Sequence, residues 1–226
     1  PESLEEIREL FEDATDPPVT AATALAELDL AGLREIDDVG LRTRRLKEID
    51  AFLQRILEQA PDLTDAKLAR VNVAIGLGED QRAEDLCREV LESSPRNRRA
   101  RRMAALLKAE KGELREAERE LFSLRTDYRN WIPGRLAYAE VMRSLGEVEV
   151  AGEAMRTVTE LDPGNRQART FLAEYLMSQG FHDQALADAE ACYKANPDVP
   201  DTLRLYARAA LAAGQRVQLL EELQRA

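Results

Sequence analysis

The sequence contains little of what most metal-dependent and disulfide-stabilised proteins rely on. Its 226 residues include 1 histidine, 2 cysteines and 1 tryptophan, and aromatic residues make up 5% of the chain. Two cysteines cannot build a disulfide framework or a cysteine-rich zinc module. No stretch approaches the roughly 20 apolar residues that a membrane-spanning helix needs. We therefore expect neither a disulfide scaffold nor direct insertion into a membrane.

The residues that are abundant favour a folded helical protein. Hydrophobic residues make up 44% and charged residues 33% of the chain, and Ala, Leu, Glu and Arg dominate. These four residues are good helix formers, and the balance argues against disorder. We expect a soluble protein, cytoplasmic or periplasmic. The 27 arginines against 5 lysines indicate a GC-rich genome, which favours a bacterial source.

An internal repeat of 34 residues organises most of the chain. The glycines of this series are Gly78, Gly112, Gly146, Gly180 and Gly214. Five residues after each glycine comes Ala83, Ala117, Ala151, Ala185 and finally Leu219. The prolines of the same register are Pro61, Pro95, Pro163 and Pro197, with Arg129 in the one remaining slot. Three residue series in one register indicate a true repeat.

Each repeat reads as two helices joined at the glycine. An amphipathic segment such as 100–110 precedes the glycine, and a second one such as 115–124 follows it. Glycine adopts a positive φ at little cost and so ends the first helix, while the small alanine lets the two helices approach closely. A single helical hairpin leaves apolar faces bare, so we expect the hairpins to stack.

This 34-residue helix–turn–helix pattern resembles the tetratricopeptide repeat family. Leu161-Asp162-Pro163 matches the end of the family's motif, and a small residue stands at the eighth position of each repeat. Those small residues are Val71, Ala105, Ala139, Ala173 and Ala207. The resemblance implies an all-α, right-handed α-solenoid over residues 64–226. Its repeats lie near 64–97, 98–131, 132–165 and 166–199, with a truncated one near 200–226.

Residues 1–63 form a helical N-terminal region that departs from the repeat pattern. A capping box at Ser3 opens a short helix, and we predict further helices over residues 20–36 and 42–59. We interpret residues 30–63 as a divergent repeat. At the other end, Ala226 lies inside a predicted helix whose leucines, Leu219, Leu220 and Leu223, lack a cover. We therefore expect a piece of a longer bacterial protein.

Candidate catalytic groups are few, and we expect neither enzymatic activity nor a cofactor. His182 lies just past a turn without Cys or carboxylate partners at ligand spacing, so it predicts no metal site. Cys87 and Cys192 fall on inner helix faces three repeats apart, which predicts two buried, unbridged thiols. The glycines follow the repeat and form no phosphate-binding loop.

Charge is distributed unevenly along a chain whose net charge is −11. Residues 1–63 hold 7 basic and 16 acidic groups, whereas residues 64–131 hold 15 basic and 13 acidic groups. Five arginines fall between positions 96 and 102. The cluster is compatible with a solvated surface or with an acidic protein partner. Nucleic acid is disfavoured because no aromatic residues interleave with the arginines.

The resemblance also implies where a partner binds. Family members read a peptide with positions 2, 5, 9, 12 and 13 of each first helix, a spacing that stays on one helical face. The predicted partner-binding residues of this concave groove are Asn72, Arg99, Arg102, Glu140, Arg143, Glu174, Met177, Arg204 and Arg208. Leu68 and Met103 replace a lysine and an asparagine that chaperone-binding members use, so a chaperone tail is not expected.

Two functional hypotheses follow. The first is a non-catalytic protein–protein interaction scaffold that binds a partner protein or peptide in the groove. The alternative is a self-associating assembly segment of a cell-envelope complex for secretion or exopolysaccharide export, which would make the chain a homo-oligomer. The identity of the partner and the pathway are not encoded in any pattern of the sequence.

Overall fold

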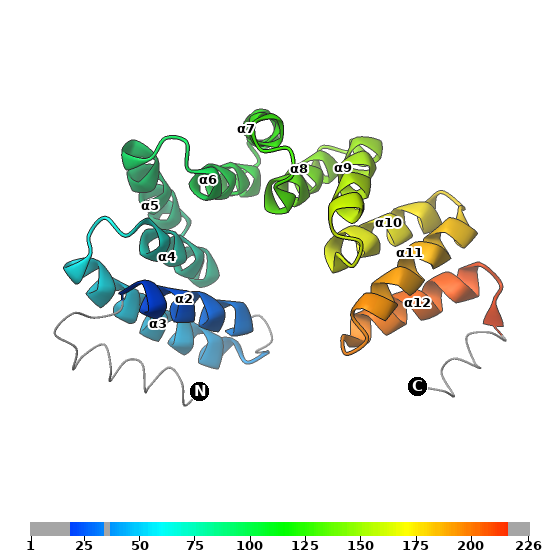
Figure 1. Ribbon diagram of the computed structural model, residues 1–226, viewed down its shortest axis with the longest axis horizontal. Helices are drawn as coiled ribbons and strands as arrows, with labels where there is room; N and C mark the ends of the chain where they lie inside the picture. Colours follow the sequence, from blue (N-terminus) through cyan, green and yellow to red (C-terminus); the bar gives the residue numbers. More distant parts are fainter. Residues whose placement is uncertain (1–18, 34–36, 217–226) are drawn as a thin grey trace. The chain divides into compact units, whose positions relative to one another are not determined.

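The computed structural model describes residues 19–33 and 37–216. Within these ranges the regular structure is α-helical and contains no β-strand, as Figure 1 shows. The helices are α2 (Val19–Gly32), α3 (Val39–Gln59), α4 (Thr64–Leu77), α5 (Asp80–Ser93), α6 (Arg98–Glu110), α7 (Leu114–Asp127), α8 (Ile132–Ser144), α9 (Val148–Leu161), α10 (Arg166–Ser178), α11 (His182–Ala195) and α12 (Pro200–Ala212). The prediction of an all-α protein is confirmed.

The chain divides into two compact units. Unit 1 comprises residues 1–107 and unit 2 comprises residues 108–226, so the boundary falls within α6. Unit 1 contains α2 to α5 and most of α6. Unit 2 contains the end of α6 and helices α7 to α12.

The five glycines of the 34-residue series end the first helices as predicted. Their φ angles run from 72° at Gly78 to 85° at Gly112, in the left-handed region. At the first turn, the Gly78 N–H donates to the Ile75 carbonyl over 3.0 Å, and the Glu79 N–H donates to the Ala74 carbonyl over 2.9 Å. The same pair of bonds recurs at the other four glycines. These bonds satisfy the carbonyls that a helix end leaves open.

Small residues pack where two helices of a repeat cross. The alanines that follow the turns, Ala83, Ala117, Ala151 and Ala185, are each fully buried. The small residues in the first helices are buried as well in the first four repeats, whereas Ala207 is half-buried. A larger side chain at the crossing would separate the helices, so close packing accounts for the recurrence of alanine.

The core of unit 1 begins with a long helix. One face of α3 buries Leu46, Ile49, Phe52, Leu53 and Ile56 against α2 and α4. In Figure 1, α2 lies beside α3.

The helix predicted to begin at residue 42 begins earlier, at Val39, because the Asp38 carboxylate accepts a hydrogen bond from the Leu41 N–H over 2.9 Å. The helix predicted over residues 20–36 is α2, which ends at Gly32, and residues 34–36 lie outside the described ranges. The predicted helix at Ser3 and the C-terminal leucines also lie outside them.

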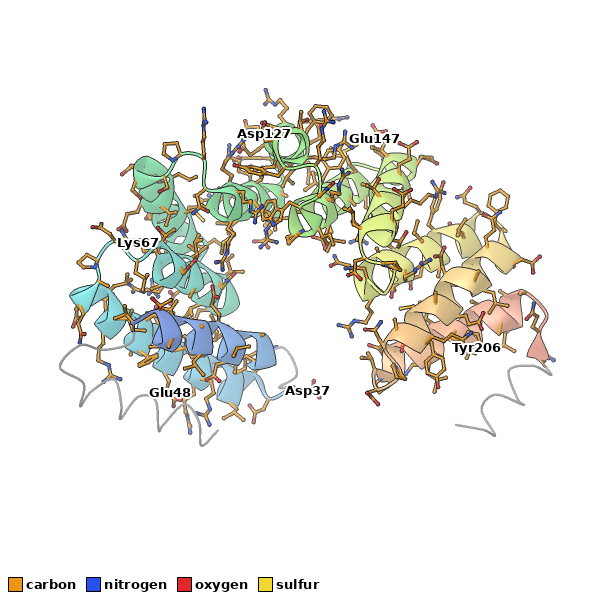
Figure 2. The ribbon with its side chains drawn as sticks, in the orientation of Figure 1. Asp37, Glu48, Lys67, Asp127, Glu147 and Tyr206 are labelled. Atoms are coloured by element: carbon orange, nitrogen blue, oxygen red, sulfur yellow. The ribbon has the colours of Figure 1, made fainter. Side chains whose placement is uncertain are left out.

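Unit 2 is a row of packed helices. Helices α8 and α9 pack together, as do α10 and α11, and α12 contacts both α10 and α11. Tyr193 of α11 and Tyr206 of α12 stack with ring centroids 5.8 Å apart and planes at 7°, and Figure 2 labels Tyr206. Aromatic stacking of this kind adds to the stabilisation that burial provides.

Candidate functional site

A cavity of about 610 Å³ lies in unit 1 among α2, α3, α4 and α6. Leu30, Leu33, Leu46 and Ile75 provide its apolar lining. Its polar lining consists of Glu27, Arg42, Asn72 and Arg99. A concave apolar pocket with a few converging polar groups is the usual form of a binding site. Two of the predicted groove residues, Asn72 and Arg99, therefore share one cavity.

Arg99 reaches the cavity with its charge already compensated. One guanidinium nitrogen lies 2.5 Å from a carboxylate oxygen of Glu27, and another lies 2.8 Å from one of Asp65. These ion pairs tie α6 to α2 and to α4. A partner's carboxylate would have to compete with two that are already in place, so the role that the structure supports for Arg99 is to hold the cavity wall.

Arg42 and Asn72 are the cavity's available polar groups. The Arg42 side chain is half-buried and the Asn72 side chain is exposed. Within the described ranges, neither side chain forms a hydrogen bond or an ion pair. A guanidinium offers five N–H donors, and the amide offers both donors and an acceptor. The cavity can therefore take an apolar group that carries an acceptor or a negative charge beside it.

In unit 2 the predicted groove residues lie on the first helices α8, α10 and α12. The Gln167 amide donates to the Glu140 carboxylate over 2.5 Å and joins α10 to α8. An Arg208 guanidinium nitrogen lies 3.5 Å from a Glu174 carboxylate oxygen and joins α12 to α10. The structure thus joins Glu174 and Arg208 directly and connects Glu140 to α10 through Gln167.

The other predicted residues differ in how available they are. Arg204 pairs with Asp201 over 2.8 Å, and both side chains are exposed. Arg143 is exposed and makes no ion pair within the described part of the chain. Met177 is half-buried against the core of α11 and α12, and Arg102 is half-buried on α6. Arg143 is therefore the cationic group of this set that a partner could reach without displacing a carboxylate.

Sequence reasoning missed Glu27 and Arg42. Both lie on the hairpin of α2 and α3, which falls outside the regular 34-residue register. The only available signal was the apolar face of residues 42–59, which predicts that this helix packs against the first regular repeat. That signal locates the hairpin but does not indicate which of its polar residues face the cavity.

The thiols are poorly suited to chemistry. Burial, together with the charge of Glu84, raises the pKa of the Cys87 thiol to about 11. Burial also raises the pKa of Cys192 above its ordinary value. Both thiols are free and buried. A thiolate is the reactive form, so protonated buried thiols are poor nucleophiles and poor metal ligands.

The described residues contain neither a candidate metal cluster nor a candidate membrane span. No group of three or more His, Cys, Asp or Glu side chains there is arranged to hold a metal ion. None of the described helices combines the length and the apolar character that crossing a membrane requires.

Comparison with known proteins identifies the fold. No family model and no curated protein matches the chain. Among solved structures, TTC0263, a thermophilic TPR protein of Thermus thermophilus, is 21% identical, with a TM-score of 0.64 over 82% of this chain and 99% of its own. PilF of Pseudomonas aeruginosa is 18% identical, with a TM-score of 0.67 over 92% of each chain.

A third similar structure is YrrB, described as a TPR protein with an unusual peptide-binding site. It is 20% identical, with a TM-score of 0.51 over 88% of this chain and 95% of its own. These likenesses agree with the glycine-capped hairpins and the buried alanines at the helix crossings. The chain therefore has the tetratricopeptide-repeat fold, an α-solenoid built from 34-residue helix–turn–helix repeats.

Proposed function

We propose that the chain is a non-catalytic scaffold that binds a peptide segment of a partner protein on the first-helix face of its repeats. The observation that carries the proposal is the cavity of unit 1, where Asn72 and Ile75 of a first helix meet the available Arg42 guanidinium. YrrB, a protein of the same fold, is described as having a peptide-binding site.

The lining of the cavity suits a peptide segment. It combines aliphatic side chains with the polar groups of Glu27, Arg42, Asn72 and Arg99. Such a surface suits a segment in which an apolar side chain neighbours a polar or acidic one. The exposed arginines of unit 2, Arg143 and Arg204, would add charge contacts to a longer segment.

We also propose that the chain has no catalytic role. His182 is exposed at the start of α11, and both thiols are buried and hold their protons. A nucleophile needs a base within hydrogen-bond reach, and neither thiol has a histidine or carboxylate hydrogen-bonded to it in the described ranges.

Peptide selection tests this function directly. A displayed random-peptide library is selected on the whole chain, and the affinities of the recovered peptides are measured for matched variants. Arg42→Glu and Arg143→Glu change first-helix or cavity positions, while Arg88→Glu and Arg156→Glu change exposed positions on second helices. We expect the first pair to weaken binding by at least about tenfold and the second pair to leave it nearly unchanged. The opposite pattern would place binding on the second helices.

Self-association is the second candidate, with the chain as an assembly segment of a larger bacterial envelope protein. Among the described residues, Leu211 favours it, because this leucine of α12 is 51% exposed. Light scattering over a range of concentrations tests it, and Leu211→Gln should shift any dimer towards monomer. A purely monomeric protein at high concentration would contradict this candidate.

A further inference from the structure

Two arginines occupy equivalent positions in consecutive repeats of unit 2. Arg135 near the start of α8 and Arg169 near the start of α10 are separated by one 34-residue period. The Arg135 Nε donates to the Arg129 carbonyl over 2.7 Å, and the Arg169 Nε donates to the Pro163 carbonyl over 3.0 Å. Arg129 and Pro163 are themselves equivalent positions. The two guanidiniums are therefore held in the same way by the loop that precedes their helices.

The two arginines differ in what compensates their charge. Arg169 forms an ion pair with the carboxylate of Asp188 on α11. The position equivalent to Asp188 one repeat earlier is Ala154 on α9, which is 2% exposed. Arg135 thus has the orientation of Arg169 without its acidic partner.

A second cation, Arg125 of α7, contacts α8 at Tyr138, three residues after Arg135. The Arg125 guanidinium of α7 lies 4.9 Å from the Phe122 ring centroid and 4.6 Å from that of Tyr138. Burial lowers the pKa of Arg135, and the charge of Arg125 lowers it further, so the two guanidiniums act on each other. The position equivalent to Arg125 one repeat later is Thr159, so this second cation has no counterpart in the next repeat.

The acidic groups around this pair do not neutralise it by contact. Glu160 raises the pKa of Arg135 through space, and Glu118 and Glu147 act in the same way on Tyr138. Figure 2 labels Glu147, which lies just before α9. Within the described ranges, no carboxylate lies at ion-pair distance from Arg125 or Arg135. Two half-buried cations without an ion pair stand out in a protein with 43 acidic residues.

We propose that Arg125 and Arg135 form a binding site for a phosphate monoester carried by a partner protein, that is, for a phosphorylated side chain. Two guanidiniums match the double negative charge of a phosphate monoester, whereas a single carboxylate would leave one of them uncompensated. The site uses α7 and α8 and shares no residue with the cavity of unit 1, so it does not depend on the proposed peptide groove.

The N–H donors of the Arg125 and Arg135 guanidiniums are available to a ligand. The Arg125 guanidinium contacts the Phe122 and Tyr138 rings and forms no ion pair within the described ranges, so its N–H groups can bind a ligand's oxygen atoms. The bond from the Arg135 Nε to a backbone carbonyl fixes that side chain and leaves its terminal nitrogens for a ligand. Phe122 is 46% exposed and can contact the peptide that carries the phosphate.

NMR of the arginine Nε–Hε signals tests the site in the whole chain. The probes are N-acetyl-O-phosphoserine N-methylamide, the corresponding glutamate compound and inorganic phosphate, at matched ionic strength. We expect saturable shifts of the Arg125 and Arg135 signals with the phosphoserine compound, weaker binding of the glutamate compound, and no saturable shift of Arg169. No shift, or equal shifts at all three arginines, would overturn the proposal. Binding of inorganic phosphate without the phosphoserine compound would overturn a partner-borne ligand.

Variants that restore or remove charge sharpen the test. Ala154→Asp supplies the carboxylate that Arg169 already has, and should weaken binding of the phosphoserine compound by at least about tenfold. Should that variant not fold, Arg125→Gln changes a half-buried side chain near the surface and should weaken binding by a similar factor. Unchanged affinity in a folded variant would contradict the proposal.

Asp188→Ala is the matched control for the need for two cations. It leaves Arg169 without its carboxylate and without a counterpart of Arg125, because the equivalent position is Thr159. We expect Arg169 in this variant to bind the phosphoserine compound at least about tenfold more weakly than the Arg125–Arg135 pair of the unmodified chain does. Equal affinity at the two places would show that a single uncompensated arginine is sufficient, and would refute the argument for a paired site.

Discussion

Asp50 connects three helices of unit 1, and its removal should be costly. One of its carboxylate oxygens accepts from the Arg70 Nε over 2.9 Å, and the other lies 2.5 Å from a terminal nitrogen of Arg82. Asp50 is on α3, Arg70 on α4 and Arg82 on α5. The Asp50 and Arg70 side chains are 20% and 16% exposed, so much of the water that would screen the pair is absent.

The free-energy cost of removing Asp50 should lie between the values typical of exposed and of fully buried ion pairs. Exposed pairs contribute about 0–1 kcal/mol, whereas removing one partner of a fully buried pair costs about 3–5 kcal/mol. With about four-fifths of the Asp50 side chain covered, we expect Asp50→Ala to lower the free energy of unfolding by about 1.5–3 kcal/mol. The assay is urea unfolding followed by circular dichroism.

An exposed ion pair of the same chemistry provides the control. Asp201 and Arg204 lie 2.8 Å apart, with side chains 78% and 74% exposed. Asp201→Ala should therefore change the free energy of unfolding by less than about 0.5 kcal/mol. Equal losses in the Asp50 and Asp201 variants would refute the argument that burial decides the strength of these pairs.

The Asp50 contribution should also depend on pH. Burial by itself raises the pKa of Asp50, but the hydrogen bonds and charges of Arg70 and Arg82 outweigh it, and the pKa lies below its ordinary value of 3.8. A lowered folded-state pKa stabilises the fold above the unfolded-state pKa, and this stabilisation is lost as the pH falls towards the folded-state value. The difference between the unmodified chain and Asp50→Ala should thus be constant above about pH 5 and shrink below about pH 4.

Three further predictions concern the repeat itself. Ala151→Leu should overpack a helix crossing and lower the free energy of unfolding by about 1–3 kcal/mol, measured by thermal unfolding. The control, Ala24→Leu on the exposed side of α2, should leave it nearly unchanged. An unchanged Tm for Ala151→Leu would contradict the placement of Ala151 at the crossing. Gly146→Ala places a side chain on a residue with φ of 82° and should lower the free energy of unfolding by about 1–2 kcal/mol. Gly32→Ala, in a helix with open space around it, should be neutral or stabilising. Equal effects of the two substitutions would contradict the left-handed turn at Gly146. Both buried cysteines should resist a thiol reagent at pH 8 until urea unfolds the chain, because burial raises the pKa of Cys87 to about 11 and shields both thiols. Fast reaction of the folded protein would contradict their burial.

The regular repeats were predictable because the residues that define their turns and helix crossings act locally. A glycine at φ 72–85° and a buried alanine five residues later each depend on only a few neighbouring residues, so the spacing alone indicates the hairpin. Helix α2 was harder to bound. It is rich in alanine, its apolar face is short, and α3, which follows it, is longer than any second helix of the regular repeats.

The candidate site was only partly predictable for a related reason. Helical periodicity places Asn72 and Arg99 on the first-helix face, but the partners of Arg99 are contributed by α2 and α4. Whether a guanidinium is available or already paired depends on side chains far away in sequence. The 34-residue register shows that Ala154 stands where the next repeat has Asp188. The contact between Arg125 and Tyr138, in contrast, is seen only in the three-dimensional structure.

The central claim is that peptides bind the first-helix face, and site-specific photo-crosslinking tests it most directly. A photoreactive residue is placed at Asn72, an exposed position on the cavity of unit 1, or at Arg88, an exposed position on the second helix α5. A peptide selected on the unmodified chain is then irradiated with each protein. We expect a crosslink from position 72 and little or none from position 88. A crosslink from position 88 alone would contradict it.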